Sequence, residues 1–348
     1  MPRDELAQNS GVTSEPRPTL DAVAARCGLS VTTVSRALRG RGEMAAETRA
    51  RVLAAARDLG YRRDGERRGR PRTGTSRLID LVLGRFHDPY SEQVTAGAQI
   101  AAAELGYDLV LTTERDAPRD DWPMRIRSRG SAGVVIGVIT PTTSQVTVLA
   151  DAGIPIVLLG PRGDASLPLW NVGTTDHAGG TDAAAHLIDR GARRFVVIAG
   201  EPTFRFGRAR VQGFEAEAER RMPGAVVVRE RADWTSGQAR RATARALTEI
   251  PGDGPIGLFA CSDEMAAGAY RAIAEAGLSI GRDVLVVGFD DVRGARWLQP
   301  PLTTIRQPLR EMAATAVGLL ADAAEGRSVE RPSLELPTTL VPRASTGA

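Results

Sequence analysis

From residue 78 onward, short apolar runs alternate with alanine-rich segments, and this alternation constrains the fold more than any other feature. Nearly continuous apolar strands separated by helices are typical of parallel sheets covered on both faces. About 270 residues of this pattern exceed one comfortable sheet, so we expect an α/β core of two lobes with a ligand site at the carboxyl ends of the strands. The expected strands are 78–83, 107–113, 132–139, 154–159, 169–172, 193–199, 224–229, 255–260 and 284–289.

The segment TLDAVAARCGLSVTTVSRAL, residues 19–38, predicts two short helices around a tight turn. Gly28 falls where the first helix must end, because glycine tolerates the positive φ of such a turn, and Ser30 is a suitable N-cap for the second helix. Val34 and Leu38 continue an inner apolar stripe. This spacing is typical of a helix-turn-helix, whose second helix enters the major groove of DNA; an ordinary helical hairpin is the alternative.

Charge is distributed unevenly along the chain. Residues 1–76 contain 15 Arg and 9 acidic residues, a net charge of +6. Residues 77–348 contain 30 Arg and 33 acidic residues, a net charge of −3. A basic N-terminal segment followed by a slightly acidic remainder is expected where one end of a protein binds phosphates. This asymmetry favours DNA as the partner of the N-terminal segment.

The sequence disfavours several other classes of protein. No apolar run approaches the roughly 18 residues of a membrane span, and the polar N-terminus lacks a secretory signal, which argues against a periplasmic carrier. Cys27 and Cys261 lie in different expected domains, so we expect no disulfide, no metal site and a cytoplasmic location. An enzyme is the competing class, but no phosphate-binding glycine motif or GxSxG motif occurs at an expected strand end.

Four parts are expected along the chain. They are a disordered tail (1–17), a three-helix headpiece (18–62), an Arg/Gly-rich hinge linker (63–76) and an α/β core (77–343). The third helix of the headpiece is expected from about 46 to 59. In the core, the first lobe is expected to contain about 77–175 and 306–330, and the second lobe about 176–305 and 331–343.

Several blocks of this chain resemble the LacI/GalR (lactose-repressor/galactose-repressor) family of bacterial transcription regulators. They are TLDAVAARCGLSVTTVSRAL, ETRARVLAAARDLGYR, GARRFVVIAG with RARVQGF, CSDEMAAGAYRAIAEAGLSIGRDVLVVGFDD, and PPLTTIRQP. The resemblance implies a homodimer whose helix-turn-helix headpieces bind a pseudo-palindromic operator in double-stranded DNA. It also implies a periplasmic-binding-protein-like core, without a cofactor, that binds a small effector which alters operator affinity.

The resemblance assigns DNA contacts to the headpiece residue by residue. Val31, Thr32 and Arg36 match the base-reading positions, and Arg36 can pair with guanine through two hydrogen bonds. Thr33 has the alternative of being merely solvated. Contacts that set orientation on the phosphates are expected from Thr19, Ser30, Thr33, Ser35 and Arg49.

The linker departs from the family, most of whose members place a hinge helix with a leucine wedge here. Arg70 falls at or beside the place of that leucine, and Gly69 and Pro71 oppose a helix. The tetrapeptide RGRP resembles the core of an AT-hook, so we expect Arg68 and Arg70 to contact the minor groove. The alternative is a basic, flexible linker.

The resemblance also implies an effector site between the lobes. Arg210 matches the family's effector-binding arginine, Asp290 follows a strand, and Trp234 offers a flat face to a sugar ring. Ser262 stands where the family commonly has Asn, and Gly160 where some sugar-binding members have an acidic residue. The expected effector-binding residues are Phe86, Asp88, Tyr90, Arg210, Asp233, Trp234, Ser262, Asp290 and Gln307.

Each of these sites has a structural alternative. Asp263 is expected to cap the helix that follows it more readily than to bind a ligand, Asp291 can be structural, and Trp234 can fill the core. Together the patterns predict a sequence-specific DNA-binding regulator, a repressor, whose operator affinity is controlled by a small effector, a sugar.

Overall fold

The computed structural model describes residues 19–38, 46–59, 76–114, 121–160, 169–327 and 333–347. The chain divides into two compact units, Met1–Arg72 and Thr73–Ala348. The expected tail and residues 63–75 of the expected linker lie outside the described residues, so Arg68 and Arg70 do as well. Within the described part, no helix has the length and apolarity that a membrane span needs.

Three helices are described in the N-terminal unit, α1 (Leu20–Cys27), α2 (Val31–Leu38) and α3 (Ala46–Asp58). Gly28 ends α1 in the left-handed conformation, with φ +64°, as the turn requires. The hydroxyl of Ser30 accepts a hydrogen bond from the backbone N–H of Thr33 at 3.2 Å, which makes Ser30 the predicted N-cap of α2.

Small side chains fill the space between these three helices. Leu29 and Leu38 are partly buried against this core, as the apolar stripe predicts. Because alanine, valine and cysteine are short, the helices can pack closely without a large central side chain. The buried residues are Val23, Ala24, Cys27, Val34, Ala37, Val52, Ala55 and Ala56.

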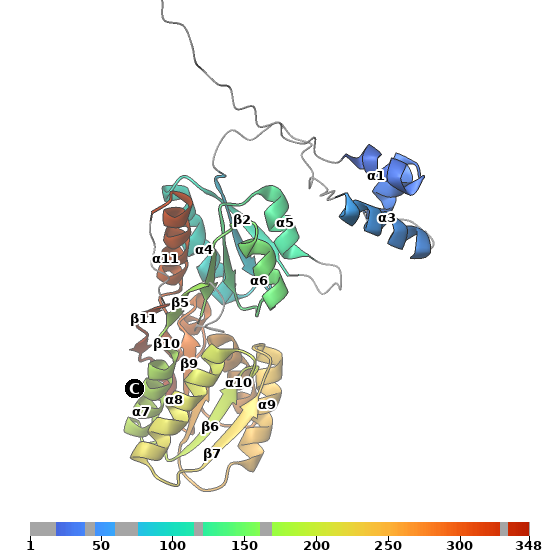
Figure 1. Ribbon diagram of the computed structural model, residues 1–348. Coiled ribbons are helices and arrows are strands. Elements are labelled where there is room, and N and C mark those ends of the chain that lie inside the picture. Colours follow the sequence, from blue (N-terminus) through green and yellow to red (C-terminus); the bar gives the residue numbers. More distant parts are fainter. Residues whose placement is uncertain are drawn as a thin grey trace, which may run out of the picture. The chain divides into compact units, whose positions relative to one another are not determined.

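The second unit contains two six-stranded sheets, each covered by helices on both faces (Figure 1). The sheet of lobe 1 has the strand order β11-β5-β4-β3-β1-β2 and is parallel throughout. Helices α4 and α11 pack on one face and α5 and α6 on the other. The bounds are β1 (Leu78–Leu83), α4 (Pro89–Glu104), β2 (Asp108–Thr113), α5 (Trp122–Arg129), β3 (Gly133–Gly137), α6 (Thr143–Ala150), β4 (Ile156–Leu159), β5 (Trp170–Thr174), α11 (Leu309–Ala324) and β11 (Ser333–Leu336).

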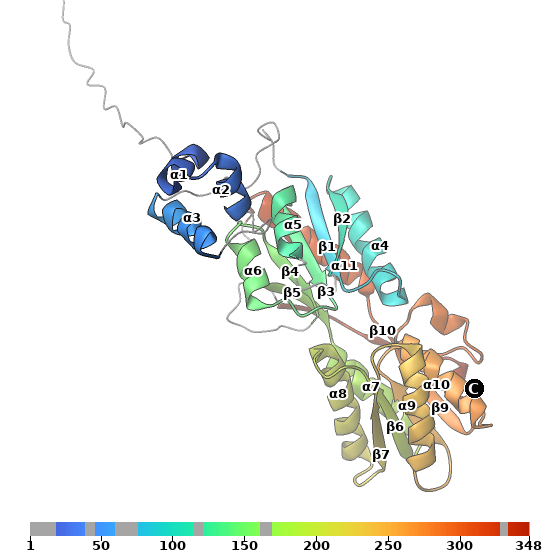
Figure 2. The ribbon, with the colours of Figure 1, turned by 90° about the vertical axis from the view of Figure 1, so that its right-hand side faces the viewer.

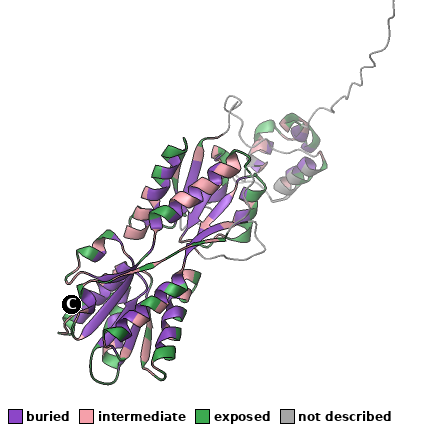
Figure 3. Cartoon of the chain, turned by 90° about the vertical axis from the view of Figure 1, so that its left-hand side faces the viewer, coloured by how far each residue is buried: buried purple, intermediate pink, exposed green. Residues whose placement is uncertain are grey.

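The sheet of lobe 2 has the order β12-β10-β9-β8-β6-β7, and only the β10–β12 pair is antiparallel among the described strands. Its central strands β9, β8 and β6 are buried on both faces (Figure 3), which confirms the predicted α/β fold. The bounds are α7 (Asp176–Asp189), β6 (Arg194–Ala199), α8 (Arg205–Arg221), β7 (Val227–Arg231), α9 (Ser236–Glu249), β8 (Ile256–Ala260), α10 (Asp263–Glu275), β9 (Val284–Asp290), the 3₁₀ turn η1 (Arg293–Arg296), β10 (Thr303–Arg306), β12 (Thr339–Val341) and the 3₁₀ turn η2 (Ala344–Thr346).

The chain crosses between the lobes three times, after β5, after β10 and after β11. These crossings lie side by side where the lobes meet (Figure 2). The expected start of the last lobe 2 segment at residue 331 is wrong, because Ser333–Leu336 still pairs with β5 of lobe 1. The return to lobe 2 comes after Leu336, just before β12 begins at Thr339.

Candidate functional site

The second helix of the headpiece turns a polar face outward. Val31 is 40% exposed, Thr32 is exposed, and Thr33 and Ser35 are partly exposed. An exposed valine beside threonines can contact thymine methyl groups and base edges, which fits the base-reading role that Val31 and Thr32 were expected to have. The hydroxyls of Ser30 and Thr33 lie 2.7 Å apart and form a hydrogen bond.

Two further headpiece positions are known only by their place in a helix. Arg36 lies in α2 and Arg49 in α3, but both side chains lie outside the described part of the structure. Thr19 uses its hydroxyl to accept from the N–H of Ala22 at 3.2 Å and so caps α1. The contacts of these three residues with DNA remain predictions.

A cavity of about 360 Å³ lies between the two lobes, at the carboxyl ends of their strands. The predicted residues Asp88, Tyr90, Arg210, Asp233, Trp234, Ser262 and Asp290 are all on its wall. The structure therefore brings together residues from the connections after β1, β7 and β8, from the end of β9, and from α4 and α8. The other lining residues are Gly84, Arg85, Pro89, Ser91, Val138, Glu201, Phe204, Phe206, Glu264 and Val292.

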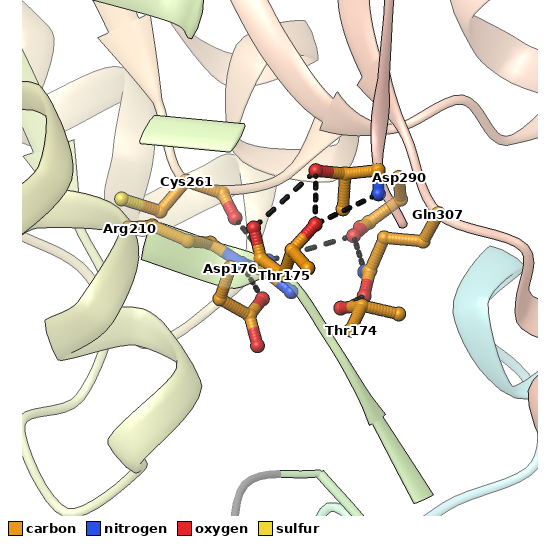
Figure 4. Close-up of polar contacts among 8 residues, drawn as sticks. Thr174, Thr175, Asp176, Arg210, Cys261, Asp290 and Gln307 are labelled. Carbon is orange, nitrogen blue, oxygen red and sulfur yellow. Dashed lines mark hydrogen bonds and ion pairs between the residues drawn. The ribbon is translucent and has the colours of Figure 1, made fainter. Parts of the chain in front are cut away.

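Arg210 is buried on the lobe 2 side of this cavity, at 3% exposure (Figure 4). Its Nε donates to Oδ1 of Asp176 at 2.8 Å, and its Nη1 donates to the carbonyl oxygen of Cys261 at 2.8 Å. The same Nη1 lies 3.5 Å from Oδ1 of Asp290. Two aspartate side chains therefore already contact the only buried guanidinium among the residues that line the cavity.

Three aromatic rings in the core of lobe 2 contact one another, and one of them contacts the guanidinium of Arg210. The rings of Phe214 and Phe259 stack at 5.1 Å, and the ring of Phe289 meets Phe259 at 6.4 Å. The guanidinium lies over Phe289, 3.7 Å from the ring centroid. This contact holds the planar cation flat against the sheet, because the face of an aromatic ring attracts cations.

The buried carboxyls beside Arg210 resist ionisation. Burial is the largest cause that raises the pKa of Asp290, to about 7, and it outweighs the opposing effect of Arg210. Burial also raises the pKa of Asp176. Asp263 lies deeper, and burial together with the charge of Asp290 raises its pKa well above the ordinary value. This region of lobe 2 thus holds more carboxyls than cations.

Three aromatic rings form one wall of the cavity. The ring of Trp234 lies 5.2 Å from that of Phe206 and 6.2 Å from that of Phe204, and the two phenylalanines stack at 5.3 Å. Gly200 and Gly207 leave the space that the indole occupies, since a Cβ at either position would fall within 3 Å of it. Trp234 therefore faces the cavity and is only partly buried.

Several residues that line the cavity also accept hydrogen bonds from the backbone at a helix start or a turn. Asp88 caps α4 by accepting from the N–H of Ser91 at 2.9 Å, and Ser262 caps α10 by accepting from Met265. Asp233 accepts from the N–H of Thr235 at 3.1 Å in the turn before α9. These bonds fix the carboxylates and the hydroxyl at the cavity wall while leaving further oxygen lone pairs for a ligand.

Two predicted residues are not on the wall of this cavity. Phe86 packs against the core of lobe 1 instead, because a large ring at the start of this loop gains more from burial there. Gln307 lies at the second crossing, where its amide donates to Asp290 at 2.6 Å and accepts from Thr174 at 2.7 Å. It lines a smaller adjoining pocket together with Tyr90 and Arg210.

Two aspartates for which the sequence left a structural role open, Asp263 and Asp291, do make contacts within the protein. Asp263 accepts from Thr304 at 2.6 Å and from the N–H of Val292 at 2.9 Å, so it ties α10 to β10 rather than capping a helix. Asp291 pairs with Arg306 and Arg343. Neither aspartate is on the cavity wall.

Among the lining residues that sequence reasoning missed are Glu201, Phe204, Phe206 and Glu264. The first three lie in or just after the connection that follows β6, and Glu264 is in the first turn of α10 after β8. The rule that ligands bind at strand carboxyl ends points to both connections, so it could have found them. Among the described residues, no group of three or more His, Cys, Asp or Glu is placed to hold a metal ion.

Comparisons with known proteins agree with this architecture. Residues 19–64 match the model of the bacterial regulatory proteins of the lacI family, and residues 184–346 match that of the periplasmic binding protein-like domain. An uncharacterised HTH-type transcriptional regulator of Streptomyces limosus is 34% identical over 342 residues, which cover 94% of each chain.

Solved structures show the same fold at similar identity. The complex of the transcriptional regulator CelR with cellobiose is 28% identical, with a TM-score of 0.70 over 94% of this chain and 100% of that one. A lac repressor dimer bound to operator and the anti-inducer ONPF is also 28% identical, with a TM-score of 0.69 over 95% of this chain and 99% of that one. By these relatives, and by the headpiece and two-lobed core that it shares with them, the chain belongs to the LacI family of bacterial regulatory proteins.

Proposed function

We propose that this chain is a transcriptional repressor that binds operator DNA through its headpiece. Its affinity for that DNA changes when a small carbohydrate occupies the cavity between the lobes. The observation that carries the proposal is the cavity between the lobes, which is lined by the aromatic rings of Trp234 and Phe206 and by the polar side chains of Arg210 and Asp290. We place the protein in the cytoplasm with its DNA, and we assign it neither a cofactor nor a catalytic step.

The chemistry of the cavity suits a sugar. Its volume of about 360 Å³ falls within the range of roughly 300–1,000 Å³ that is common for small-molecule sites. Aromatic faces pack against the apolar face of a pyranose ring, while carboxylates and the Ser262 hydroxyl can bond its hydroxyls. CelR, which has the same fold, is solved with cellobiose, and this supports a carbohydrate for the present chain.

On the DNA side, we propose that α2 reads bases in the major groove. The exposed Val31 and Thr32 support this role, and Arg36 in the same helix supplies the guanine-specific contact. Arg68 and Arg70 are proposed to contact the minor groove next to that site.

Ligand binding can act on DNA affinity only if the ligand prefers one arrangement of the lobes. The cavity wall comes from both lobes, with Asp88 and Tyr90 in lobe 1 and Arg210 and Trp234 in lobe 2. A ligand that contacts both walls therefore favours one closure angle. We propose that this angle sets the positions of the two headpieces of a dimer relative to each other.

A dimer is supported by exposed apolar side chains on lobe 1. Ile100 is 53% exposed and Leu105 41% exposed at the end of α4, and Leu111 on the adjoining strand β2 is 50% exposed. Exposed apolar side chains on neighbouring elements often mark an association surface. We propose that this surface, Ile100, Leu105 and Leu111, pairs with its copy in a homodimer, which mass measurement in solution tests directly.

The experiment for the proposed function uses the full-length protein and a DNA duplex obtained by selection from a random pool. Fluorescence anisotropy should give an affinity for that duplex that changes when a carbohydrate that binds the protein is added. Arg36→Ala should abolish binding of the duplex and leave carbohydrate binding intact. A ligand that binds but leaves DNA affinity unchanged at saturation, or an Arg36→Ala protein that binds DNA normally, would overturn the proposal.

A further inference from the structure

The charges on the cavity wall do not balance. Two cations line the cavity, Arg85 and Arg210, against five carboxylates. Arg210 is engaged by Asp176 and Asp290, and Arg85 lies 3.4 Å from Asp88. Each lining cation therefore already has at least one carboxylate as its partner. The five lining carboxylates are Asp88, Glu201, Asp233, Glu264 and Asp290.

Three of these carboxylates remain without a cation. Glu201, Asp233 and Glu264 form no ion pair within the described residues. They come from three neighbouring connections of lobe 2, after β6, after β7 and after β8. Because β7, β6 and β8 are adjacent strands, these three carboxylates lie along one side of the cavity.

The same side of the cavity carries the aromatic wall. Phe204 and Phe206 follow Glu201 along the chain, and Trp234 follows Asp233 directly. Aromatic faces attract ammonium groups, and adjacent carboxylates strengthen that attraction by direct charge pairing. The combination is poorly suited to an anion, which would meet Asp290 and the three unpaired carboxylates before it reached Arg210.

We propose that the effector is an amino sugar, a carbohydrate with a protonated amine that lies against Glu201, Asp233 and Glu264 beside the Trp234 ring. This inference rests on the proposed function, since it names the chemical class of the ligand that the cavity takes. The ring hydroxyls contact Asp290 and Ser262, and the ammonium supplies a positive charge beside the three lining carboxylates that have no ion pair.

The test compares three ligands of one ring size that differ in charge: D-glucosamine, D-glucose and D-glucuronate, with the galactose series as a second set. Isothermal titration calorimetry of the full-length protein should show that, in the series that binds, the amino sugar binds most tightly, the neutral sugar less tightly and the sugar acid most weakly. Three partly exposed ion pairs are each worth a small factor, and together they predict a preference of roughly tenfold for the amine over the neutral sugar.

Two substitutions then locate the preference. Glu201→Gln with Glu264→Gln should reduce the preference for the amine over the neutral sugar to about twofold or less. Glu249→Gln, which changes an exposed carboxylate at the end of α9 away from the cavity, is the matched control and should keep the full preference.

The inference fails if the neutral sugar binds as tightly as the amine, if the acid binds best, if no amine in either series binds, or if the double variant keeps the preference. A neutral sugar that binds at least as tightly as the amine and shifts DNA affinity would overturn this inference and leave the proposed function standing. An amine that binds tightly yet leaves DNA affinity unchanged would overturn the proposed function instead.

Discussion

Gly200 is one residue on which the shape of the cavity depends. A Cβ at this position would fall 2.1 Å from the indole of Trp234, so Gly200→Ala must push the ring out of its place beside Phe206. We expect this substitution to weaken carbohydrate binding about two- to tenfold, because stacking contacts of an aromatic wall contribute on the order of 0.5–1.5 kcal/mol. Isothermal titration with the best ligand measures the effect.

The matched control is Gly237→Ala in α9 of the same lobe, where a Cβ would meet no atom within 4 Å. It adds the same methyl group without touching Trp234. Ligand affinity should stay at the wild-type value. If Gly200→Ala also keeps that value, the Trp234 ring has no part in the site.

Asp290 makes the stability of the core depend on pH. In the unfolded chain its carboxyl ionises near 3.8, whereas burial raises the pKa to about 7 in the folded protein. Between these values the folded state holds a proton that the unfolded state has lost, so the stabilising contribution of Asp290 is full below 3.8 and is lost as the pH rises through 7.

Asp290→Asn should therefore reduce the slope of unfolding free energy against pH between about 4 and 7. The largest share that one carboxyl can remove is about 1.4 kcal/mol per pH unit. Some slope should remain, since the pKa of Asp176 is raised as well. Urea unfolding at several pH values is the measurement, with Asp253→Asn, an exposed loop residue, as control; a variant with the wild-type slope would show that Asp290 ionises normally.

How far single residues could be predicted differs from site to site. Arg210 and Asp290 stand in blocks that resemble the family, and Trp234 was predicted from its flat apolar face; all three line the cavity. Phe204 and Phe206 stand in no block that resembles the family, and their place on the wall depends on packing against Trp234, which lies about 30 residues further along the chain. Phe86 packs against the core of lobe 1 and not on the cavity wall, because the sequence does not say which way a loop side chain turns.

At the scale of the helix, α7 and α8 approach each other more closely than ordinary side chains allow. A Cβ on Gly213 would lie 2.0 Å from the carbonyl oxygen of His177, and one on Gly180 would lie 2.0 Å from that of Arg210. The two glycines let the helix backbones touch. This close crossing sets Asp176 at the start of α7 within 2.8 Å of Arg210 on α8.

Gly213→Ala should force these helices apart. We expect a loss of about 1–3 kcal/mol of unfolding free energy, as for overpacked cores, together with weaker ligand binding as the Arg210–Asp176 pair lengthens. Gly318→Ala in α11 has open space for its methyl group, and it should leave stability unchanged or raise it by up to about 1 kcal/mol. Equal urea midpoints for the two variants would contradict the close crossing.

Elements were predictable where they are long and apolar. The strands up to β9 lie within a few residues of their expected bounds. The last three strands, β10, β11 and β12, were not expected as strands, because each has four residues or fewer and mixes polar with apolar side chains. Such strands depend on partners far along the chain, with β11 pairing with β5, and no local pattern records that pairing.

For the molecule as a whole, the three crossings form the joint between the lobes. They are bonded to one another rather than independent: the hydroxyls of Thr175 and Thr338 lie 2.9 Å apart, and the Thr338 N–H donates to the Thr175 hydroxyl at 2.9 Å. Gln307 joins the middle crossing to Thr174. Any change in the angle between the lobes must act on these bonds, so they are where ligand binding in one place can be transmitted to the rest of the core.

Thr338→Val tests this joint, because it keeps the shape of the side chain and removes only the hydroxyl that meets Thr175. Neither residue lines the cavity, so the ligand dissociation constant should stay within about threefold. A lost hydrogen bond of roughly 0.5–1.5 kcal/mol loosens the joint, and the ratio of DNA affinities without and with ligand should move two- to tenfold closer to one. Thr147→Val removes a hydroxyl bonded only within α6 of lobe 1 and should leave that ratio unchanged. If both variants keep the wild-type ratio in fluorescence anisotropy, the crossings do not transmit the effect of the ligand, and the coupling must run through the cavity walls instead.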